Sequence, residues 1–235
     1  MRDIGWSSII APNYVPPRLL KQMISRRLIM AWDPFGDFSS RGILRNKFGT
    51  KDQTTLERLE KFSIEANMPR ALNILSREQR IDLRAWRRTH AVLFSDIYPW
   101  AGKIRALDVE RANVRFNTVR MIEEEAAVVF AKAEDGDFFR ENMDYVYGEL
   151  AFNHPFMDGN GRSLNTVFSE MSRRAGISIR WDVVDKGEYL RHLTRAVQLT
   201  EYEGLGEYLS SLAIPVEDND MSARRLIQTL PPSKM

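Results

Sequence analysis

The sequence predicts an all-α domain. Apolar residues recur at the spacing of amphipathic helices over most of the chain. The length of 235 residues, with 43% hydrophobic and 28% charged residues, is sufficient for one globular domain with modest extensions. The chain contains no cysteine, which excludes disulfides and thiolate metal sites. A net charge of +2 is too small to indicate a nucleic-acid partner.

Seven helices are expected, over residues 54–65, 76–97, 118–133, 143–152, 163–175, 186–198 and 204–212. The second begins with a capping box, in which the side chains of Ser76 and Gln79 would bond backbone amides of the first turn. The buried face of that helix is expected to contain Ile81, Leu83, Trp86, His90 and Phe94. Gly176 should end the fifth helix, and residues 177–181 should form an extended connection.

The most informative segment is the run His154-Pro-Phe-Met-Asp-Gly-Asn-Gly-Arg162. The helix before it should end near Asn153, because Pro155 disfavours helical geometry at the preceding residue. Gly159 and Gly161 can take positive φ, so that successive backbone amides could form an anion-binding nest. Another helix should begin directly after the run, and its N-terminal dipole would add to the attraction of a phosphate.

The other members of the run suit the same chemistry. His154, at the helix exit, would lie within reach of a hydroxyl presented to a bound phosphate. Asp158 is placed to supply one carboxylate ligand of Mg²⁺, whose other ligands would be phosphate oxygens and water. A fixed positive charge at Arg162 is unfavourable in the first turn of a helix unless an anion is nearby, which favours a role toward a ligand. Phe156 should pack in the core and anchor the turn.

This run resembles the signature of the Fic family of Fic/Doc proteins, His-x-Phe-x-(Asp/Glu)-Gly-Asn-Gly-Arg-x-x-Arg, and matches it at every specified position except the last. Further segments resemble other parts of a Fic domain in the same order, namely 33–35, 42–47, 98–105 and 114–116. The resemblance implies a helical bundle with a short β-hairpin flap near the active site. The expected organisation is an N-terminal extension over 1–32, a Fic domain over 33–212 and a C-terminal tail over 213–235.

The roles known in the family can be carried onto the matching positions. By the resemblance, His154 is the general base for a side-chain hydroxyl of a target protein, which attacks the α-phosphate of ATP, and Asp158 holds Mg²⁺. The residues expected at the nucleotide are Phe156, Gly159, Asn160, Gly161, Arg162 and Asn165, with the two glycines and Asn160 forming the anion hole. Asn160 would also reach the α-phosphate, and Arg162 would contact the β-phosphate. The resemblance therefore implies a protein adenylyltransferase that modifies Ser, Thr or Tyr of another protein.

The flap of the family pairs with an extended segment of the target protein through backbone hydrogen bonds. In this chain it would comprise Asn113, Val114, Arg115, Phe116 and Asn117. Because backbone groups make the contact, the flap places few demands on the target sequence.

The chain departs from the signature at Asn165, where the family has an Arg that typically binds the γ-phosphate. Asn cannot supply that charge, and a charge-assisted hydrogen bond contributes roughly 1.5 to 3 kcal/mol. Two alternatives therefore stay open: a phosphotransferase or other nucleotidyl transferase on the same fold, and a non-catalytic interaction module. Gly161 stands where the phosphotransferring Doc branch carries Lys, which favours adenylylation.

Many Fic proteins are restrained by a helix with the pattern (Ser/Thr)-x-x-x-Glu-(Gly/Asn), and this chain has no such string. The nearest, Thr200-Glu-Tyr-Glu-Gly204, is one residue too short. Restraint is therefore expected from a separate antitoxin-like partner, from delivery, or from a weak site. No transmembrane run or secretory leader is apparent, which favours a cytoplasmic location, and some family members enter host cells as secreted effectors.

Residues outside the run have simpler explanations. His90 on an apolar helix face and His192 in a basic helix are more consistent with packing or local hydrogen bonds than with catalysis. Lys103 and Arg105 are either surface charges or groups that attract ATP. Within the N-terminal extension, the basic amphipathic stretch 19–31 favours a helix packed on the domain over a membrane-surface helix.

Overall fold

The computed structural model describes residues 43–111 and 114–216. Its α-helices are α3 (Gln53–Arg77), α4 (Leu83–Phe94), α5 (Ile122–Ala133), α6 (Gly136–Glu141), α7 (Met143–Asn153), α8 (Asn160–Arg174), α9 (Lys186–Leu199) and α10 (Glu203–Leu212). The prediction of a helical bundle with a short hairpin is confirmed. The expected N-terminal helix, Asn113 and the tail beyond residue 216 lie outside the described residues. Within the described ranges, none of the helices is long and apolar enough to cross a membrane.

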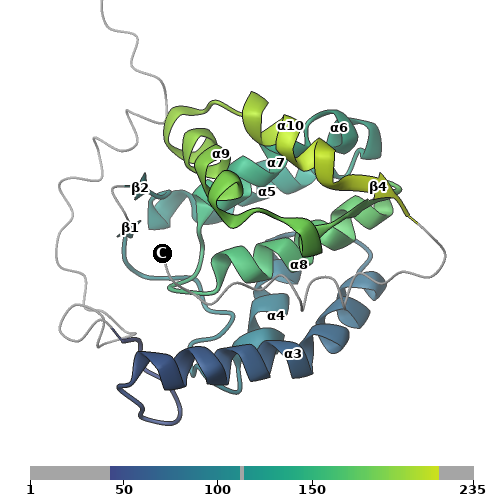
Figure 1. Ribbon diagram of the computed structural model, residues 1–235. Coiled ribbons are helices and arrows are strands. Elements are labelled where there is room, and N and C mark those ends of the chain that lie inside the picture. The colour runs from purple at the N-terminus through teal and green to yellow at the C-terminus, as the bar shows by residue number, and fades with distance from the viewer. Residues whose placement is uncertain (1–42, 112–113, 217–235) are drawn as a thin grey trace, which may run out of the picture.

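Helix α8 occupies the middle of the bundle (Figure 1). It packs against α3 and α4 on one side and against α7 on the other, while α9 and α10 pack against α7. Four apolar residues of α8 at helical spacing are buried, namely Leu164, Val167, Phe168 and Met171. The helix that follows the glycine-rich run is therefore the centre of the hydrophobic core.

Two tryptophans attach neighbouring segments to α8 through hydrogen bonds. The indole N–H of Trp86 on α4 donates to the hydroxyl of Ser163 at 2.9 Å, and that of Trp181 donates to Ser169 at 2.8 Å. Both rings are almost completely buried. A buried indole N–H needs an acceptor, so the two serines fix the position of α8 relative to these segments.

Helix α3 extends well beyond the predicted range of 54–65. It runs through Pro69 to Arg77, and its second half buries Met68, Ala71 and Leu75. A proline inside a helix removes one backbone hydrogen bond, and for that reason a proline in a sequence commonly marks the end of a helix. Packing against α4 offsets this loss, because tertiary burial contributes most of the stability of a helix in a protein.

The predicted capping box at Ser76 is wrong, because Ser76 belongs to the last turn of α3. Helix α4 instead begins after Asp82, whose carboxylate accepts a hydrogen bond from the backbone of the first turn at 2.8 Å. The guanidinium of Arg174 on α8 donates to the backbone carbonyls of Leu75 and Glu78 at the end of α3, at 3.0 and 2.6 Å. The break between α3 and α4 is therefore fixed in part by a residue nearly 100 positions away.

A second small sheet was not expected. Strand β3 (Ile177–Ile179) lies in the segment that was predicted as an extended connection, and it pairs antiparallel with β4 (Ala213–Pro215). The backbone N–H of Val216 also donates to the carbonyl of Gly176 at 3.2 Å. The packed unit thus continues through residue 216, past the expected boundary at 212.

The first sheet is the predicted hairpin. Strand β1 (Glu110–Arg111) pairs antiparallel with β2 (Val114–Arg115). The backbone N–H of Phe116 donates to the carbonyl of Val109 at 3.3 Å, which continues the pairing by one residue. The chain then enters a short 3₁₀ turn (Val119–Met121) and α5.

Candidate active site

The segment between α7 and α8 forms a tight turn that begins at His154. Helix α7 ends at Asn153, as Pro155 predicted, and His154 adopts a left-handed backbone conformation with φ 44° and ψ 60°. A left-handed conformation costs a residue other than glycine roughly 1 to 2 kcal/mol. Such a conformation persists only where the surrounding contacts hold it, and it is common at functional sites.

Gly159 closes the turn and precedes the first residue of α8. Its φ is 75°, and a Cβ built there would lie 2.6 Å from the ring of Phe94 and 3.1 Å from the Nε2 of His90. Only glycine satisfies both the backbone conformation and the available space. Gly161 differs, since a Cβ built there meets nothing within 4 Å.

The first turn of α8 is suited to an anion. Among the described residues, no side chain caps this helix end, and Gly161 is exposed. Unpaired amides and the helix dipole together attract negative charge at a helix N-terminus. Of the two glycines expected to take positive φ, only Gly159 does so, because Gly161 already belongs to α8. The expected anion site is therefore the first turn of α8, which is exposed at Gly161 and sterically restricted at Gly159.

Asn160 holds the turn together through its side chain. Its Nδ2 donates to the carbonyl of Phe156 at 2.7 Å, and its Oδ1 accepts from the backbone N–H of the same residue at 2.8 Å. The side-chain amide of Asn160 therefore closes the turn. Phe156 is fully buried and packs on His90 with ring centroids 3.9 Å apart, as an anchor of the turn should.

His90 supports the turn from α4. Its Nδ1 accepts from the backbone N–H of Gly102 at 2.9 Å, so its Nε2 carries the proton and donates to the carbonyl of Asp158 at 2.8 Å. Burial lowers the pKa of His90 to about 3, which keeps the imidazole neutral. The expectation of a packed and hydrogen-bonded histidine is thus met, although its partner lies in the motif turn.

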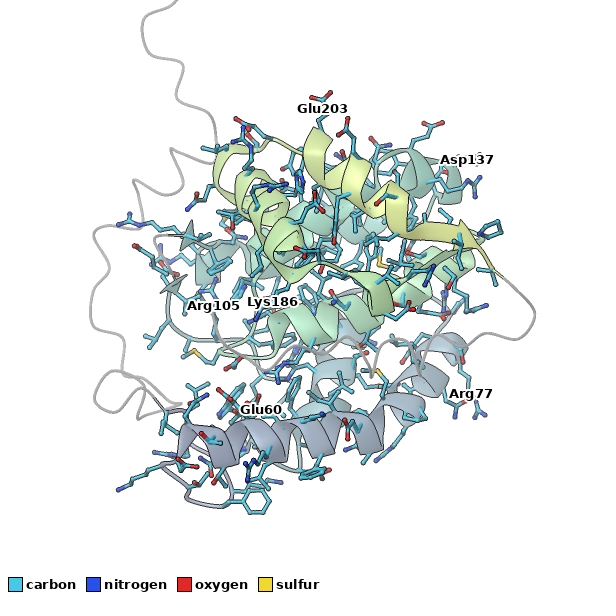
Figure 2. All side chains as sticks on the ribbon, viewed as in Figure 1. Glu60, Arg77, Arg105, Asp137, Lys186 and Glu203 are labelled. Atoms are coloured by element: carbon cyan, nitrogen blue, oxygen red, sulfur yellow. The ribbon has the colours of Figure 1, made fainter. Side chains whose placement is uncertain are left out.

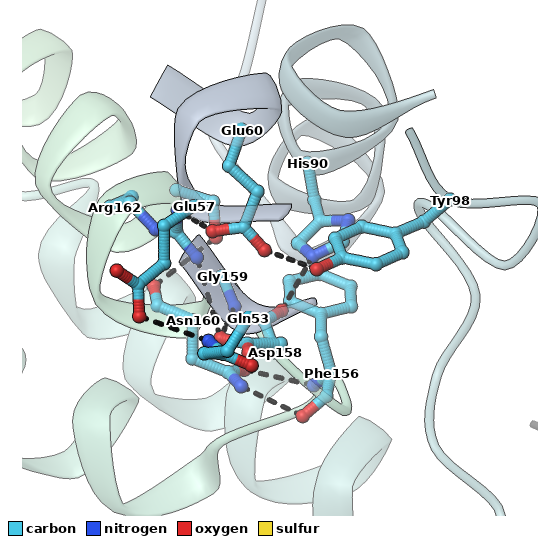
Figure 3. Close-up of polar contacts among 11 residues, drawn as sticks. Gln53, Glu57, Glu60, His90, Tyr98, Phe156, Asp158, Gly159, Asn160 and Arg162 are labelled. Carbon is cyan, nitrogen blue, oxygen red and sulfur yellow. Dashed lines mark hydrogen bonds and ion pairs between the residues drawn. The ribbon is translucent and has the colours of Figure 1, made fainter. Parts of the chain in front are cut away.

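Arg162 is part of a buried polar network that reaches α3 (Figure 3). Its Nη1 lies 2.5 Å from Oε2 of Glu60, and its Nη2 lies 3.4 Å from Oδ1 of Asp158. The guanidinium also lies over the ring of Phe94, 4.8 Å from its centroid. The phenol of Tyr98 donates to the other oxygen of Glu60, and burial together with the Glu60 carboxylate raises the pKa of that phenol.

The partner of Arg162 changes one expectation. The position of the Arg162 guanidinium in a first helical turn predicts a ligand anion beside it, but the carboxylate of Glu60 already supplies that negative charge. Burial by itself lowers the pKa of Arg162, but the carboxylates of Glu60 and Asp158 raise it above its ordinary value. Glu60 points from α3 into the space below α8 (Figure 2). A phosphate at this site would therefore share Arg162 with a carboxylate.

Asp158 fits a metal that arrives with a nucleotide. Its Oδ1 accepts from the backbone N–H of Gly159 at 2.5 Å, and its side chain is 23% exposed. In the part of the chain that the structure describes, no cluster of three or more His, Asp or Glu side chains is arranged to hold a metal. Mg²⁺ commonly binds through one or two carboxylates with phosphate oxygens and water, so a single Asp is an adequate donor set.

The hairpin lies against the imidazole of His154. The ring of Phe116 stacks on that imidazole with centroids 3.7 Å apart and an interplanar angle of 22°. Val114 and Arg115 are partly exposed in β2, whereas Asn117 is buried and donates its backbone N–H to the carbonyl of Phe152 at 2.9 Å. The expected flap residues thus divide into an accessible strand and a buried root.

Asn165 faces away from the Arg162 network, toward α7 and α9. The hydroxyl of Tyr147 donates to its Oδ1, and the hydroxyl of Tyr189 lies 2.5 Å from that of Tyr147. Burial raises the pKa of Tyr147 above its ordinary value and that of Tyr189 to about 12, so both phenols are neutral. The position that carries Arg in the family signature is here bonded to an uncharged phenol, which in turn contacts a second one.

Sequence reasoning missed several residues that this site depends on. Glu60 belongs to a charged stretch of α3 with no distinguishing pattern, and Tyr147 and Tyr189 lie on two different helices. Arg105 was expected at the surface or near ATP, but its side chain is completely buried and its guanidinium donates to backbone carbonyls. The only local signal was that Tyr98 and Arg105 belong to a segment that resembles part of the family sequence.

Comparison with known proteins supports the reading of the motif. A family model described as the Fic/DOC family matches residues 80–171. The protein adenylyltransferase VbhT of Bartonella schoenbuchensis is 33% identical over 189 residues, which cover 77% of this chain and 38% of VbhT. The probable protein adenylyltransferase Fic of Escherichia coli is 27% identical over 152 residues, which cover 61% of this chain and 74% of that protein. The chain thus spans well under half the length of VbhT.

Solved structures share the fold. The BepC protein of Bartonella tribocorum, described as a VirB-translocated effector with bound AMPPNP, superposes with a TM-score of 0.66 at 19% identity and covers 76% of this chain and 95% of its own. The N-terminal Fic domain of a VirB-translocated effector from Bartonella quintana, with bound ADP, has a TM-score of 0.63 at 19% identity and covers 77% of this chain and 94% of its own.

Proposed function

Because this chain belongs to the Fic/DOC family, we propose that it is a protein adenylyltransferase that transfers AMP from ATP to a Ser, Thr or Tyr hydroxyl of a target protein. The observation that carries the proposal is the turn from His154 to Gly159. It places an imidazole at one end and an uncapped helix N-terminus at the other. General-base catalysis on a phosphate ester requires both groups within one site.

In this reaction the target hydroxyl oxygen forms a bond to the α-phosphorus, and the bond from that phosphorus to the bridging oxygen breaks. The hydroxyl proton passes to the imidazole of His154, and pyrophosphate leaves. The first turn of α8 would hold phosphate oxygens through backbone N–H groups at Asn160 and Gly161. Mg²⁺, when bound at Asp158, would offset the charge of the phosphates, and Arg162 would contribute the donors that Glu60 leaves available.

The target is proposed to bind beside β2. Val114 and Arg115 are partly exposed residues of an antiparallel hairpin, and strand addition to such a hairpin is a common mode of peptide recognition. Phe116 follows them and stacks on His154, so a segment paired with β2 would lead toward the base. Asn117 is buried and serves as the root of the hairpin instead of a contact surface.

The relatives support this proposal by name and by what they bind. VbhT is named a protein adenylyltransferase, and the Bartonella Fic domains contain AMPPNP or ADP. Those domains come from VirB-translocated effectors, so we extend the proposal to delivery of this protein into a host cell. We also propose a separate antitoxin-like inhibitor, since the described helices contain no (Ser/Thr)-x-x-x-Glu-(Gly/Asn) pattern.

Two features favour a second candidate, a catalytically weak interaction module. Asn165 accepts a hydrogen bond from the neutral phenol of Tyr147, and Arg162 already has a carboxylate partner. Both features reduce the positive charge available to a triphosphate. Calorimetry with Mg-ATP separates the two candidates, because an interaction module would show no heat of binding even at millimolar nucleotide.

The decisive experiment is incubation of the protein in a lysate with ATP labelled at the α or the γ position, followed by intact-mass analysis. Transfer of AMP places the α label on the target and adds the mass of AMP, whereas a phosphotransferase transfers the γ label.

His154→Ala should abolish transfer while nucleotide affinity stays within about twofold, because a general base acts in the chemical step. His192→Ala on α9 is the matched control and should retain full activity. A collapse of nucleotide binding in His154→Ala would assign that residue a structural role.

A further inference from the structure

The segment that carries the hairpin is attached on both sides of His154. On one side, the backbone N–H of Asn117 donates to the carbonyl of Phe152 at 2.9 Å. On the other side, the backbone N–H of Arg105 donates to the carbonyl of Pro155 at 2.8 Å. The two ends of the hairpin segment therefore bracket the left-handed residue at the end of α7.

The guanidinium of Arg105 joins these two attachments. Its Nε donates to the backbone carbonyl of His154 at 2.8 Å, and its Nη2 donates to the backbone carbonyl of Asn117. Its Nη1 donates to the carbonyl of Leu107 at 2.6 Å, in the segment that leads into β1. One side chain thus binds the hairpin entrance, the hairpin exit and the peptide of the proposed base. Figure 2 shows Arg105 beside the hairpin.

The bonding of Arg105 is specific to a guanidinium. The side chain has no exposed surface, and a buried cation is tolerated only when its donors are satisfied. Burial lowers the pKa of Arg105 to about 10, while the Asp108 carboxylate, 3.8 Å from Nη1, opposes this effect. The group therefore stays charged at neutral pH and keeps donors in three directions. A lysine has a single nitrogen and cannot reach three divergent carbonyls.

We infer that Arg105 is a positioning residue that holds His154 and the target-docking hairpin in one fixed arrangement, an inference that rests on the function proposed above. The ring of Phe116, directly before Asn117, stacks on the imidazole. Any displacement of the hairpin root would therefore displace the ring that orients the base. By fixing the root, Arg105 aligns a target bound to β2 with His154 before reaction, which is how orientation lowers a barrier.

The test compares Arg105→Met and Arg105→Lys with Arg84→Met, which replaces an exposed arginine on α4. Three quantities are measured: kcat for AMP transfer, nucleotide affinity by calorimetry, and the rate at which diethyl pyrocarbonate modifies His154, followed by peptide mass. His192 in the same sample is the internal reference for modification. We expect Arg105→Met to lower kcat at least tenfold, to leave nucleotide affinity within twofold and to speed modification of His154 at least threefold. Arg105→Lys should be intermediate, and Arg84→Met should match the wild type.

A merely structural role would lower the unfolding midpoint and leave kcat and His154 modification of the folded protein unchanged, which would overturn the inference. An equal loss of nucleotide affinity and kcat would overturn it as well. If Arg105→Met does not fold, the same criteria apply to Arg105→Lys. If the wild type transfers no AMP, the proposed function fails, and the modification rate of His154 alone decides whether Arg105 positions that ring.

Discussion

Glu60 on α3 and Arg162 on α8 form a buried ion pair with 2.5 Å between Oε2 and Nη1, across 102 positions of the chain. The arginine that the family signature assigns to the β-phosphate therefore has a carboxylate partner within the protein. Removal of one partner from a buried ion pair typically costs about 3 to 5 kcal/mol, because the remaining charge is left uncompensated. With Arg162 in its proposed role at the phosphates, the pair would connect the stability of the α3–α8 contact with the affinity for nucleotide.

We expect Glu60→Gln to destabilise the free protein and to strengthen binding of Mg-ATP. Gln keeps one acceptor oxygen, so it can accept from Arg162 or from Tyr98 but not from both in their present positions, and it leaves the positive charge of Arg162 for the phosphates. Urea unfolding and calorimetry measure the two effects. Glu65→Gln is the control, since Glu65 forms only a surface pair with Lys61 at 3.8 Å. Weaker nucleotide binding in Glu60→Gln would indicate that Glu60 orients Arg162 instead of competing for it.

Two glycines in the motif should respond differently to alanine. Gly159→Ala combines a left-handed φ with a clash against Phe94, and we expect a loss of about 2 to 4 kcal/mol in unfolding free energy. Gly161→Ala meets no atom within 4 Å, so its stability should be unchanged or raised by up to about 1 kcal/mol. Its methyl group would nevertheless obstruct phosphate at the first turn of α8, and affinity for Mg-ATP should fall. Full nucleotide affinity in a stable Gly161→Ala protein would place the phosphates elsewhere.

Asn165→Arg should strengthen binding of ATP more than binding of ADP. In the pose typical of the family, an arginine at this position reaches the γ-phosphate, and a charge-assisted bond contributes roughly 1.5 to 3 kcal/mol. The same change removes the acceptor of the Tyr147 hydroxyl, so some loss of stability should accompany it. Asn165→Ala removes the acceptor without adding charge and serves as the control. Equal affinity for ATP in the Arg and Ala variants would show that the nucleotide adopts another pose.

Stability should decrease as the pH falls below 6.5, because of His90. The folded-state pKa of His90 is about 3, below the unfolded value of 6.5, so the unfolded chain binds more protons between these values. The contribution is fully present above pH 6.5 and is lost as the pH falls toward 3. Between pH 7 and pH 5 the loss attributable to His90 is about 2 kcal/mol. Urea unfolding at both pH values measures it, and His90→Gln should remove this part of the dependence, whereas His192→Gln should not.

Features set by neighbouring residues could be predicted from the sequence. The end of α7 before Pro155 depends on local backbone preferences and was located correctly. Helix α8 begins at Asn160, inside the glycine-rich run, three residues before the expected start at 163. On α4, helical spacing alone predicted the burial of Trp86, His90 and Phe94. The hairpin at Val114 followed from its resemblance to a family segment and not from alternation, because each of its strands spans two residues.

Features set by distant residues could not be predicted. The end of α3 is held by hydrogen bonds from Arg174 on α8, and the partner of Arg162 is Glu60 on α3. The helix predicted over 54–65 continues through Pro69 to Arg77, where packing against α4 offsets the backbone hydrogen bond that proline removes. Arg105 was misjudged for a related reason. A charged side chain is usually exposed, and only the convergence of three backbone carbonyls explains its complete burial.

The pairing of β4 with β3 has a practical consequence for anyone who prepares this domain. A protein cut after Leu212, where the sequence suggested the domain ends, would lack the partner strand of Ile177–Ile179. Its bare edge would offer unsatisfied amides and carbonyls to a neighbouring molecule, which is a recognised route to aggregation. A protein that extends to Val216 or beyond keeps that edge paired. It also keeps the hydrogen bond from Val216 to Gly176, directly after α8, the helix that begins at the active-site turn.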